Sequence, residues 1–179
     1  SGRLTTFPGG LSEIVDRLAS ELGDQVHRRA PAAGLKREAG KWVVEFEGEA
    51  IRDADAVVLA TPAPEAARLT RPHAAELAHA LAGIPYAAAT VVGLGYRRSE
   101  LRHDLDGFGF LCPAQEERKI LGCLWSSSLF PGHRAPEDQV LLRLIVGGVR
   151  APEIAMLDDE PLLDTVFGEL RELMGVEAV

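Results

Sequence analysis

Four apolar runs of strand length in the second half of the chain constrain its fold more than any other feature. They are separated by turn residues, and they are Ala87–Tyr96, Gly107–Leu111, Lys119–Leu124 and Gln139–Gly147. Short apolar runs divided by turns are typical of an antiparallel sheet. A helix is predicted to follow over Asp159–Met174, because apolar residues recur there at helical spacing: Leu162, Leu163, Val166, Leu170 and Leu173.

The first half of the chain has a different pattern, in which helical and strand signals alternate. The segment LSEIVDRLASELG predicts an amphipathic helix with one apolar face, made of Leu11, Ile14, Val15, Leu18 and Leu22. A hairpin is predicted next, because Gly34–Glu38 and Lys41–Glu47 flank the turn pair Ala39-Gly40. Ala56–Ala60 is a continuous apolar run that Thr61-Pro62 ends, which predicts a strand buried on both faces.

Two Ala-rich helices are expected over Ala63–Leu69 and His73–Leu81, and Ile84-Pro85 ends them. We therefore place a domain boundary near Pro85. Residues 1–85 are predicted to form a βα-type segment, and residues 86–179 a mostly antiparallel sheet with a C-terminal helix. The fold class expected for the chain is α+β (α/β).

Composition excludes some classes of function. The net charge of −8 over 179 residues argues against a nucleic-acid surface, which needs clustered Lys and Arg. No apolar run approaches the roughly 20 residues that span a bilayer, and no signal peptide opens the chain. Cys112 and Cys123 lack a His or Cys at metal-ligand spacing, so we expect packed, reduced thiols and a cytoplasmic protein. A peripheral membrane contact stays open.

The stretch TVVGLGYRRSE, from Thr90 to Glu100, has the beginning of a dinucleotide-binding loop. A complete loop reads G-x-G-x-x-G/A, and a helix follows it at once to meet the phosphates. Arg98 stands at the third small position, and a short polar segment follows it. We expect a strand instead, in which Gly93 and Gly95 leave room on one face.

Other residues with chemical potential do not form a recognisable site. Ser126, Ser127 and Ser128 lack a G-x-S-x-G elbow and are expected in a polar loop. The five histidines are scattered, and His73 and His79 have a spacing that places them on different sides of a helix. No phosphate loop of the P-loop type is present. We predict neither a metal site nor a catalytic nucleophile.

Two glycine-rich segments are the best candidates for a ligand site. GFGFLCP is expected to place Phe108 and Phe110 on one face of a strand and Leu111 on the other, and IVGG ends another strand at Ile145–Gly148. Large apolar side chains beside glycines suit a flat apolar ligand. The same residues are also compatible with an ordinary core, and chemistry alone leaves both interpretations open.

Several motifs, taken in order, resemble one enzyme family. They are FPGGLSEIVDRLASELG, WVV, ADAVVLATPAPEAARL, YAAATVVGLGY, DGFGFLCP, LGCLWSSSLFPGHRAP and VGG. Together they are similar to the soluble, oxygen-dependent protoporphyrinogen oxidases of the flavin amine oxidase superfamily, over nearly the whole chain. GFGFL-P and LG-x-x-x-x-S-x-x-FP are the most specific pieces, whereas the GGL helix and the A-x-P turn occur more widely in the superfamily.

The resemblance implies an FAD enzyme that oxidises protoporphyrinogen IX to protoporphyrin IX with molecular oxygen and releases peroxide. Some bacterial relatives prefer coproporphyrinogen III. The flavin accepts hydride in such an enzyme, and the protein orients the macrocycle against it. The resemblance therefore implies no catalytic acid or base.

The resemblance also assigns contacts by position. Those to the tetrapyrrole are implied for Phe108, Gly109, Leu111 and Ile145. Those to FAD are implied for Ala32, Thr61 and Pro62. Ala32 stands where the family often has Val beside the adenine, so it keeps a backbone contact and offers less apolar area.

The chain also departs from the family. It lacks the GxGxxG strand-turn-helix with its acidic ribose contact, the second flavin-binding segment, the Arg-bearing substrate contact and the helical membrane-associated part. We therefore expect an internal fragment, in which residues 1–85 belong to an FAD-binding domain and residues 86–179 to a substrate-binding domain. Such a fragment is predicted to be inactive and to bind FAD weakly or not at all.

Two alternatives remain open. The first is that the chain belongs to another flavin amine oxidase or a desaturase-like enzyme. The second is that it is a non-catalytic binding or self-associating module. The expected partners are a porphyrinogen and molecular oxygen, with no nucleic acid. A homodimer and a peripheral membrane contact of the parent protein stay open.

Overall fold

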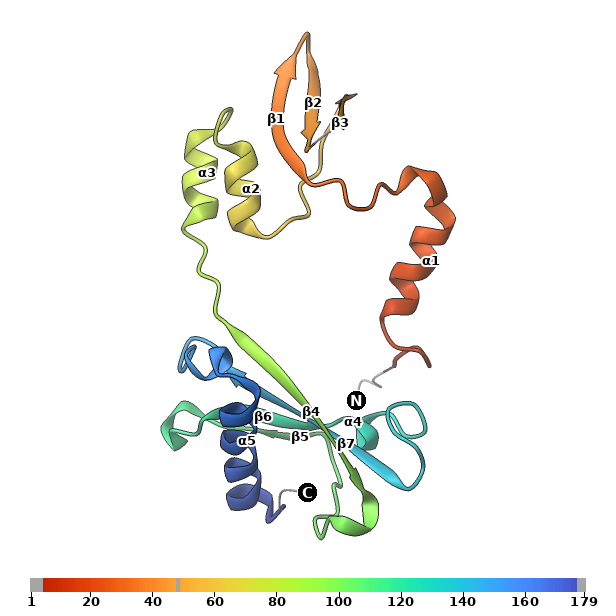
Figure 1. Ribbon diagram of the computed structural model, residues 1–179, viewed down its shortest axis with the longest axis vertical. Helices are drawn as coiled ribbons and strands as arrows, with labels where there is room; N and C mark the ends of the chain where they lie inside the picture. Colours follow the sequence, from red (N-terminus) through yellow and green to blue (C-terminus); the bar gives the residue numbers. More distant parts are fainter. Residues whose placement is uncertain (1–4, 48, 177–179) are drawn as a thin grey trace. The chain divides into compact units, whose positions relative to one another are not determined.

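The structure is a computed structural model that describes residues 5–47 and 49–176 (Figure 1). The chain forms two compact units. Ile14–Tyr86 make up the hairpin unit, and Ala87–Val179 make up the sheet unit together with the N-terminal segment that ends at Glu13. Each unit is described by itself below.

The sheet unit is built on four antiparallel strands. They are β4 (Ala89–Arg97), β5 (Gly109–Leu111), β6 (Ile120–Trp125) and β7 (Gln139–Gly147), in the spatial order β4-β7-β6-β5. All four predicted strands are therefore confirmed, as is their antiparallel pairing. Short helical turns join them, namely η2 (Arg98–Glu100), η3 (Ala114–Glu116) and η4 (Ile154–Met156). Ser126–Ser128 open the one-turn helix α4 (Ser126–Leu129), where a polar loop was expected.

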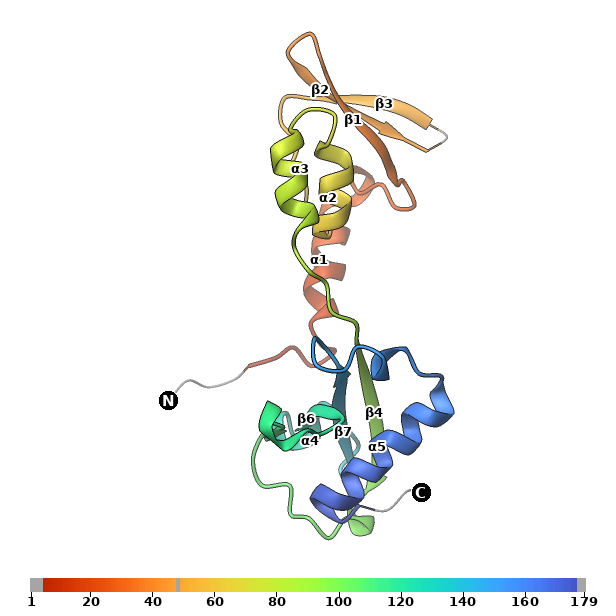
Figure 2. The same ribbon diagram turned by 90° about the vertical axis from the view of Figure 1, so that its left-hand side faces the viewer.

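One face of this sheet packs against helix α5 (Asp159–Met174), whose bounds match the prediction (Figure 2). Alternation along β7 turns Leu142, Leu144 and Val146 toward the helix, and all three are fully buried. The helix contributes the buried residues Leu162, Val166 and Leu170 to the same core. Leu163 is partly buried and Leu173 is exposed, so the stripe is narrower than expected.

Among its described residues, the hairpin unit holds three strands, two complete α-helices and most of a third. The strands β1 (Ala32–Glu38), β2 (Lys41–Phe46) and β3 (Glu49–Ala54) pair in that order, and β3 was not predicted. The helices are α1 (Ser12–Leu22), continued by the turn η1 (Gly23–Gln25), α2 (Ala63–Thr70) and α3 (Ala75–Ala82). Figures 1 and 2 show α2 and α3 side by side. The predicted hairpin turn is confirmed, since Ala39 and Gly40 both have positive φ (48° and 85°), as a tight two-residue turn requires.

The prediction of a buried strand at Ala56–Ala60 is wrong. The segment has no strand pairing, and Val58 is 89% exposed. A strand that is buried on both faces needs a neighbouring strand to accept its hydrogen bonds and a layer on each face. The described residues supply neither for this segment, so its apolar sequence alone does not make it a strand.

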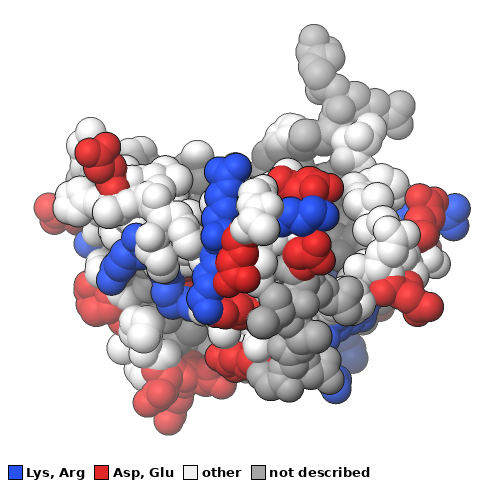
Figure 3. Space-filling view, turned by 90° about the horizontal axis from the view of Figure 1, so that it is seen from above, with Lys and Arg blue, Asp and Glu red and all other residues white. Residues whose placement is uncertain are grey.

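The apolar face of α1 is also left open. The helix has no buried residue, and Ile14, Val15 and Leu18 are all exposed. Charged side chains of both signs are mixed on the face shown in Figure 3. Within the described residues, no helix combines the length and hydropathy needed to cross a membrane.

Candidate functional site

The face of the four-stranded sheet opposite α5 carries apolar side chains and glycines, several of them exposed within the described part of the sheet unit. Strand register aligns Val91, Ile145, Gly122 and Leu111 in one row across all four strands. Directly paired residues of antiparallel strands point to the same side, so this row lies on one face. Leu111 is 77% exposed and Val91 is 51% exposed, whereas Ile145 is partly buried between its neighbours.

A second row on this open face has a glycine at each end and two larger residues between them. Gly93, Arg143, Leu124 and Gly109 are paired in order across the strands. A Cβ atom added at Gly93 would touch only the Leu141 side chain, at 3.9 Å, and one added at Gly95 would meet nothing within 4 Å. The sequence prediction that these two glycines leave room on one face of a strand is confirmed. The face therefore leaves space above β4, beside the exposed charged side chain of Arg143 on β7.

Strand β5 approaches β6 unusually closely because glycines stand on both sides of the contact. A Cβ atom at Gly109 would lie 2.0 Å from the Cys123 carbonyl oxygen, and one at Gly122 would lie 2.4 Å from the Phe110 carbonyl oxygen. Gly109 also has φ = +122°, which L side chains rarely adopt. This close approach fixes where Leu111 stands on the open face.

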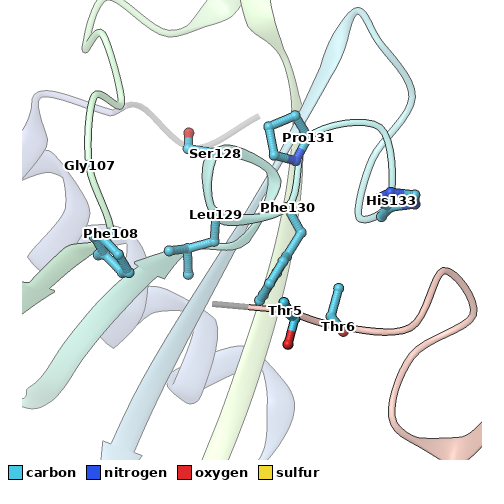
Figure 4. A pocket seen from close by; sticks show the side chains of 9 residues that line it. All are labelled: Thr5, Thr6, Gly107, Phe108, Ser128, Leu129, Phe130, Pro131 and His133. Atoms are coloured by element: carbon cyan, nitrogen blue, oxygen red, sulfur yellow. The ribbon is translucent and has the colours of Figure 1, made fainter. Parts of the chain in front are cut away.

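A pocket of about 680 Å³ opens where β5 begins and β6 ends (Figure 4). Its apolar lining includes Phe108, which is 62% exposed, together with Leu129 and Phe130. The remaining lining residues are Thr5, Thr6, Gly107, Ser128, Pro131 and His133. Figure 4 shows Phe108, Leu129 and Phe130 around the same hollow.

The structure thus brings together the substrate contacts that were predicted from sequence. Leu111 and Ile145 share one cross-strand row, Gly109 lies in the next row, and Phe108 lines the pocket at the end of β5. Their contact with a tetrapyrrole stays a prediction. Sequence reasoning assigned no role to Phe130, although a large aromatic residue before Pro131 in a quoted motif was a usable signal.

The residues predicted to contact FAD, Ala32, Thr61 and Pro62, all lie in the hairpin unit. Arg68 of α2 donates from Nη2 to the Ala32 carbonyl and from Nη1 to the Ala33 carbonyl, both at 2.7 Å. The Ala32 carbonyl oxygen therefore already accepts one hydrogen bond. Thr61 and Pro62 are exposed, and the Ala63 N–H after them donates to the Tyr86 hydroxyl oxygen at 2.8 Å.

The hairpin unit has a small cavity near the residues predicted to contact FAD. A pocket beside β1 is lined by Ala33, Leu35 and Arg68, among others, and holds about 150 Å³. Small-molecule sites are usually about 300–1,000 Å³. This cavity is smaller than a usual small-molecule site, and the predicted cofactor roles of Ala32, Thr61 and Pro62 remain predictions.

Three titratable groups of the sheet unit have a raised pKa because they are buried. Burial raises the pKa of the Cys123 thiol to about 12, and burial likewise raises the pKa of Cys112 and of Tyr96. Both cysteines are buried and free, as predicted. Within the described residues, no three His, Cys, Asp or Glu side chains are grouped closely enough to hold a metal ion.

The prediction that TVVGLGYRRSE forms a strand instead of a dinucleotide-binding loop is confirmed. Gly93 and Gly95 lie inside β4, and the three-residue turn η2 follows the strand instead of a phosphate-binding helix. His73, one of the histidines considered as metal ligands, donates from Nε2 to the Leu35 carbonyl. This hydrogen bond joins the segment between α2 and α3 to the hairpin.

Known proteins resemble this chain in sequence. The profile of the family described as "Flavin containing amine oxidoreductase" matches residues 1–179. The chain is 29% identical to the chloroplastic protoporphyrinogen oxidase of Nicotiana tabacum, over 94% of this chain and 32% of that protein. It is 35% identical to the coproporphyrinogen III oxidase of Propionibacterium freudenreichii, over 96% of this chain and 32% of that protein. The chain thus spans about a third of the length of these curated relatives.

Solved structures share the fold at lower identity. One is a protein of Exiguobacterium sp. 255-15 whose assignment as a protoporphyrinogen oxidase is provisional, with a TM-score of 0.75 and 22% identity over 97% of this chain and 37% of that one. Another is a putrescine oxidase variant, with a TM-score of 0.74 and 20% identity over 93% of this chain and 35% of that one. At these identities the likeness establishes the architecture, which confirms the mixed α and β fold with antiparallel sheets.

Proposed function

The chain belongs to the family of flavin containing amine oxidoreductases, and on this premise we propose that it is an internal part of an FAD-dependent porphyrinogen oxidase. The reaction proposed for the whole protein is the oxidation of protoporphyrinogen IX to protoporphyrin IX by molecular oxygen, a step of haem biosynthesis. The open sheet face, with Leu111 and Ile145 in one row and glycines beside them, is the observation that carries this proposal. Curated relatives named as porphyrinogen oxidases support it.

The residues of this chain would bind and orient the macrocycle. Leu111 and Ile145 offer apolar contact to a flat ring, and Gly93, Gly95 and Gly109 let the ring lie close to the strands. Phe108 offers an aromatic face at the end of β5. FAD, when bound by the whole protein, supplies the hydride acceptor. The described residues would contribute orientation, and no acid or base is assigned.

The chain alone is proposed to be inactive. The cavity beside β1 holds about 150 Å³, which is small for a dinucleotide, and Arg68 already donates to the Ala32 carbonyl. We expect the purified chain to be colourless and to show no oxygen consumption with a porphyrinogen. A stoichiometric flavin absorbance spectrum in the purified chain would refute this part of the proposal.

Porphyrin binding can be tested without flavin because the open face and the pocket lie within the sheet unit. Trp125 is a suitable reporter, since its ring lies 3.4 Å from the Cβ position of Gly107, which lines the pocket. Trp42 in the hairpin unit is replaced by Phe to remove its signal. Protoporphyrin IX and coproporphyrin III are expected to quench Trp125 saturably, and putrescine is not. Equal responses to porphyrin and amine would contradict the proposal.

Two other candidates each have an observation in their favour. The likeness to a putrescine oxidase favours another flavin amine oxidase or a desaturase-like enzyme. The exposed apolar face of α1, with Ile14, Val15 and Leu18, favours a non-catalytic module that self-associates. Sedimentation of the purified chain separates the second candidate from the proposal, because a monomer at all concentrations counts against self-association.

The proposal also covers the localisation, partners and oligomeric state of the whole protein. We propose a cytoplasmic enzyme whose partners are a porphyrinogen and molecular oxygen, with no nucleic acid. A peripheral membrane contact and a homodimer are the alternatives to a free monomer. Cell fractionation and sedimentation of the whole protein decide among these states.

A further inference from the structure

His103 contacts the segment that leads into the pocket at the start of β5. Its Nδ1 accepts a hydrogen bond from the Leu105 N–H at 2.9 Å. Its ring lies against the Trp125 ring, with the two ring centres 4.8 Å apart. Nδ1 accepts only in the neutral imidazole that carries its proton on Nε2, because both nitrogens of a protonated ring are donors. The charge of His103 therefore decides whether this hydrogen bond exists.

Leu105 is held in a strained conformation beside this bond. Its side chain is buried, and its backbone has φ = +54°, a left-handed conformation that residues other than glycine rarely adopt. Such a conformation persists only where the surrounding contacts hold it. Loss of the acceptor on His103 takes this partner from the Leu105 N–H and so removes one of the contacts that hold the segment.

The same segment forms part of the pocket wall. Gly107 and Phe108 follow Leu105 closely in the sequence, and both line the pocket (Figure 4). The Phe108 carbonyl accepts from the Trp125 N–H at 3.0 Å, and a Cβ atom at Gly107 would lie 3.4 Å from the Trp125 ring. His103 and the two pocket residues therefore contact one tryptophan, so a change at the histidine reaches the wall within a few residues.

No carboxylate replaces the bond when His103 gains a proton. The charged side chains of its own segment and of η2 are Arg98, Glu100, Arg102, Asp104 and Asp106. Strand β6 presents the uncharged ring of Trp125 to the histidine. Among the described residues, no Asp or Glu lies within ion-pair distance of the imidazole. Protonation therefore removes a hydrogen bond without forming an ion pair in its place.

We propose that His103 is a positioning residue for the macrocycle site. Its neutral ring holds Gly107 and Phe108 in the pocket wall, and its protonation releases their segment, so ligand affinity falls as the pH is lowered. Histidine side chains change charge between about pH 5 and pH 8. This inference rests on the proposed function for the identity of its ligand.

The first experiment measures the affinity of coproporphyrin III by its fluorescence anisotropy at pH 8 and at pH 5.5. The reference is His103→Asn, which keeps an acceptor oxygen near the place of Nδ1 and does not titrate. Titration of the porphyrin itself affects both proteins alike. Relative to this reference, the wild-type chain is expected to lose about five- to tenfold more affinity at the lower pH, the usual range for one hydrogen bond. His103→Ala is expected to bind as weakly at pH 8 as this loss predicts.

Two other histidines serve as controls. His79 is exposed on α3 in the hairpin unit, and His79→Asn is expected to keep the wild-type pH dependence. His133 lines the pocket, and His133→Asn is expected to keep that dependence whatever its affinity at pH 8. Circular dichroism checks that each variant is folded. If His103→Ala does not fold, the comparison of the wild type with His103→Asn still decides.

A second experiment follows the bond without ligand. Nuclear magnetic resonance records the amide proton shifts of Leu105 and Gly107 over the same pH range. Both are expected to change in the wild-type chain and to stay constant in His103→Asn. This readout separates release of the segment from any failure of the proposed function.

Four outcomes would overturn the inference. A constant Leu105 shift in the wild-type chain would show that the bond is not released. Equal pH dependence of affinity in the wild type and in His103→Asn would show that His103 does not act on the pocket, while the proposed function stands. Loss of the pH dependence in His133→Asn would assign it to the histidine of the pocket. Absence of porphyrin binding at both pH values would remove the proposed function, and with it the site that His103 positions.

Discussion

The substitution Gly109→Ala tests whether the close approach of β5 to β6 holds the candidate site in place. A methyl group at this position would lie 2.0 Å from the Cys123 carbonyl oxygen, well inside van der Waals contact. The backbone at φ = +122° adds conformational strain of about 1–3 kcal/mol for a residue with a side chain. Relief of the clash requires β5 to move away from β6.

That movement weakens the hydrogen bonds that hold the short strand. The Cys112 N–H donates to the Leu121 carbonyl at 2.9 Å, and the Trp125 N–H donates to the Phe108 carbonyl at 3.0 Å, on either side of the paired residues. Each such bond contributes about 1 kcal/mol net. We therefore expect Gly109→Ala to lower the free energy of unfolding of the sheet unit by about 2–5 kcal/mol, measured by urea denaturation with Trp125 fluorescence.

Gly95→Ala is the matched control for this measurement. Its Cβ would meet nothing within 4 Å, and its φ is not positive. Replacing Gly by Ala inside an element usually stabilises by about 0.5–1 kcal/mol, so this variant is expected to be neutral or slightly more stable. A Gly109→Ala variant that matches the wild type within experimental error would refute the claim that β5 is held by this contact.

Three further predictions test other parts of the structure. First, Gly95→Val is expected to keep the unfolding free energy of the wild type but to lower porphyrin affinity several-fold, because its side chain rises from the open face; unchanged affinity in the Trp125 titration would place the ligand elsewhere. Second, burial raises the pKa of Cys123 to about 12, so between about pH 9 and pH 12 the unfolded thiol ionises while the folded one stays protonated. Stability is therefore expected to fall as pH rises through this window, by up to about 1.4 kcal/mol per pH unit from this thiol, and Cys123→Ala is expected to reduce the slope in urea titrations at each pH. Third, Arg68→Met removes both hydrogen bonds to the Ala32 and Ala33 carbonyls from a side chain that is about half exposed, and is expected to destabilise the hairpin unit by about 1–2 kcal/mol, followed by Trp42 fluorescence. Arg71→Met, an exposed neighbour, is the control, and equal effects of the two substitutions would contradict a specific role for Arg68.

Local periodicity predicted most of the secondary structure correctly. The bounds of β7 and α5 match the expected ranges, and the turn at Ala39-Gly40 has the expected backbone conformation. These elements are determined by spacing within a few residues, such as alternation along β7 or the helical repeat of Leu162, Val166 and Leu170. The candidate substrate residues came from the resemblance, and no spacing rule would have grouped them.

Sequence alone did not predict which elements find partners. Ala56–Ala60 has the composition of a buried strand, yet a strand forms only where neighbouring chains accept its hydrogen bonds, and none of the described segments does so. Likewise β3 was missed because its pairing with β2, and not its composition, makes it a strand.

The sequence by itself determined the antiparallel sheet, the helix that covers it and the supply of glycines on one face, because these follow from local patterns of apolar residues. Only the tertiary structure decided which face stays open. A register shift between Ile120 and Gly122 turns Ile120 and Cys123 toward α5 and leaves Gly122 beside Leu111 on the other side. The fold also joined Thr6 to Arg134 across the length of the chain and placed Phe130 and Phe108 in the lining of one pocket. Contacts between such distant residues depend on how strands pair and loops close, and no local pattern encodes them.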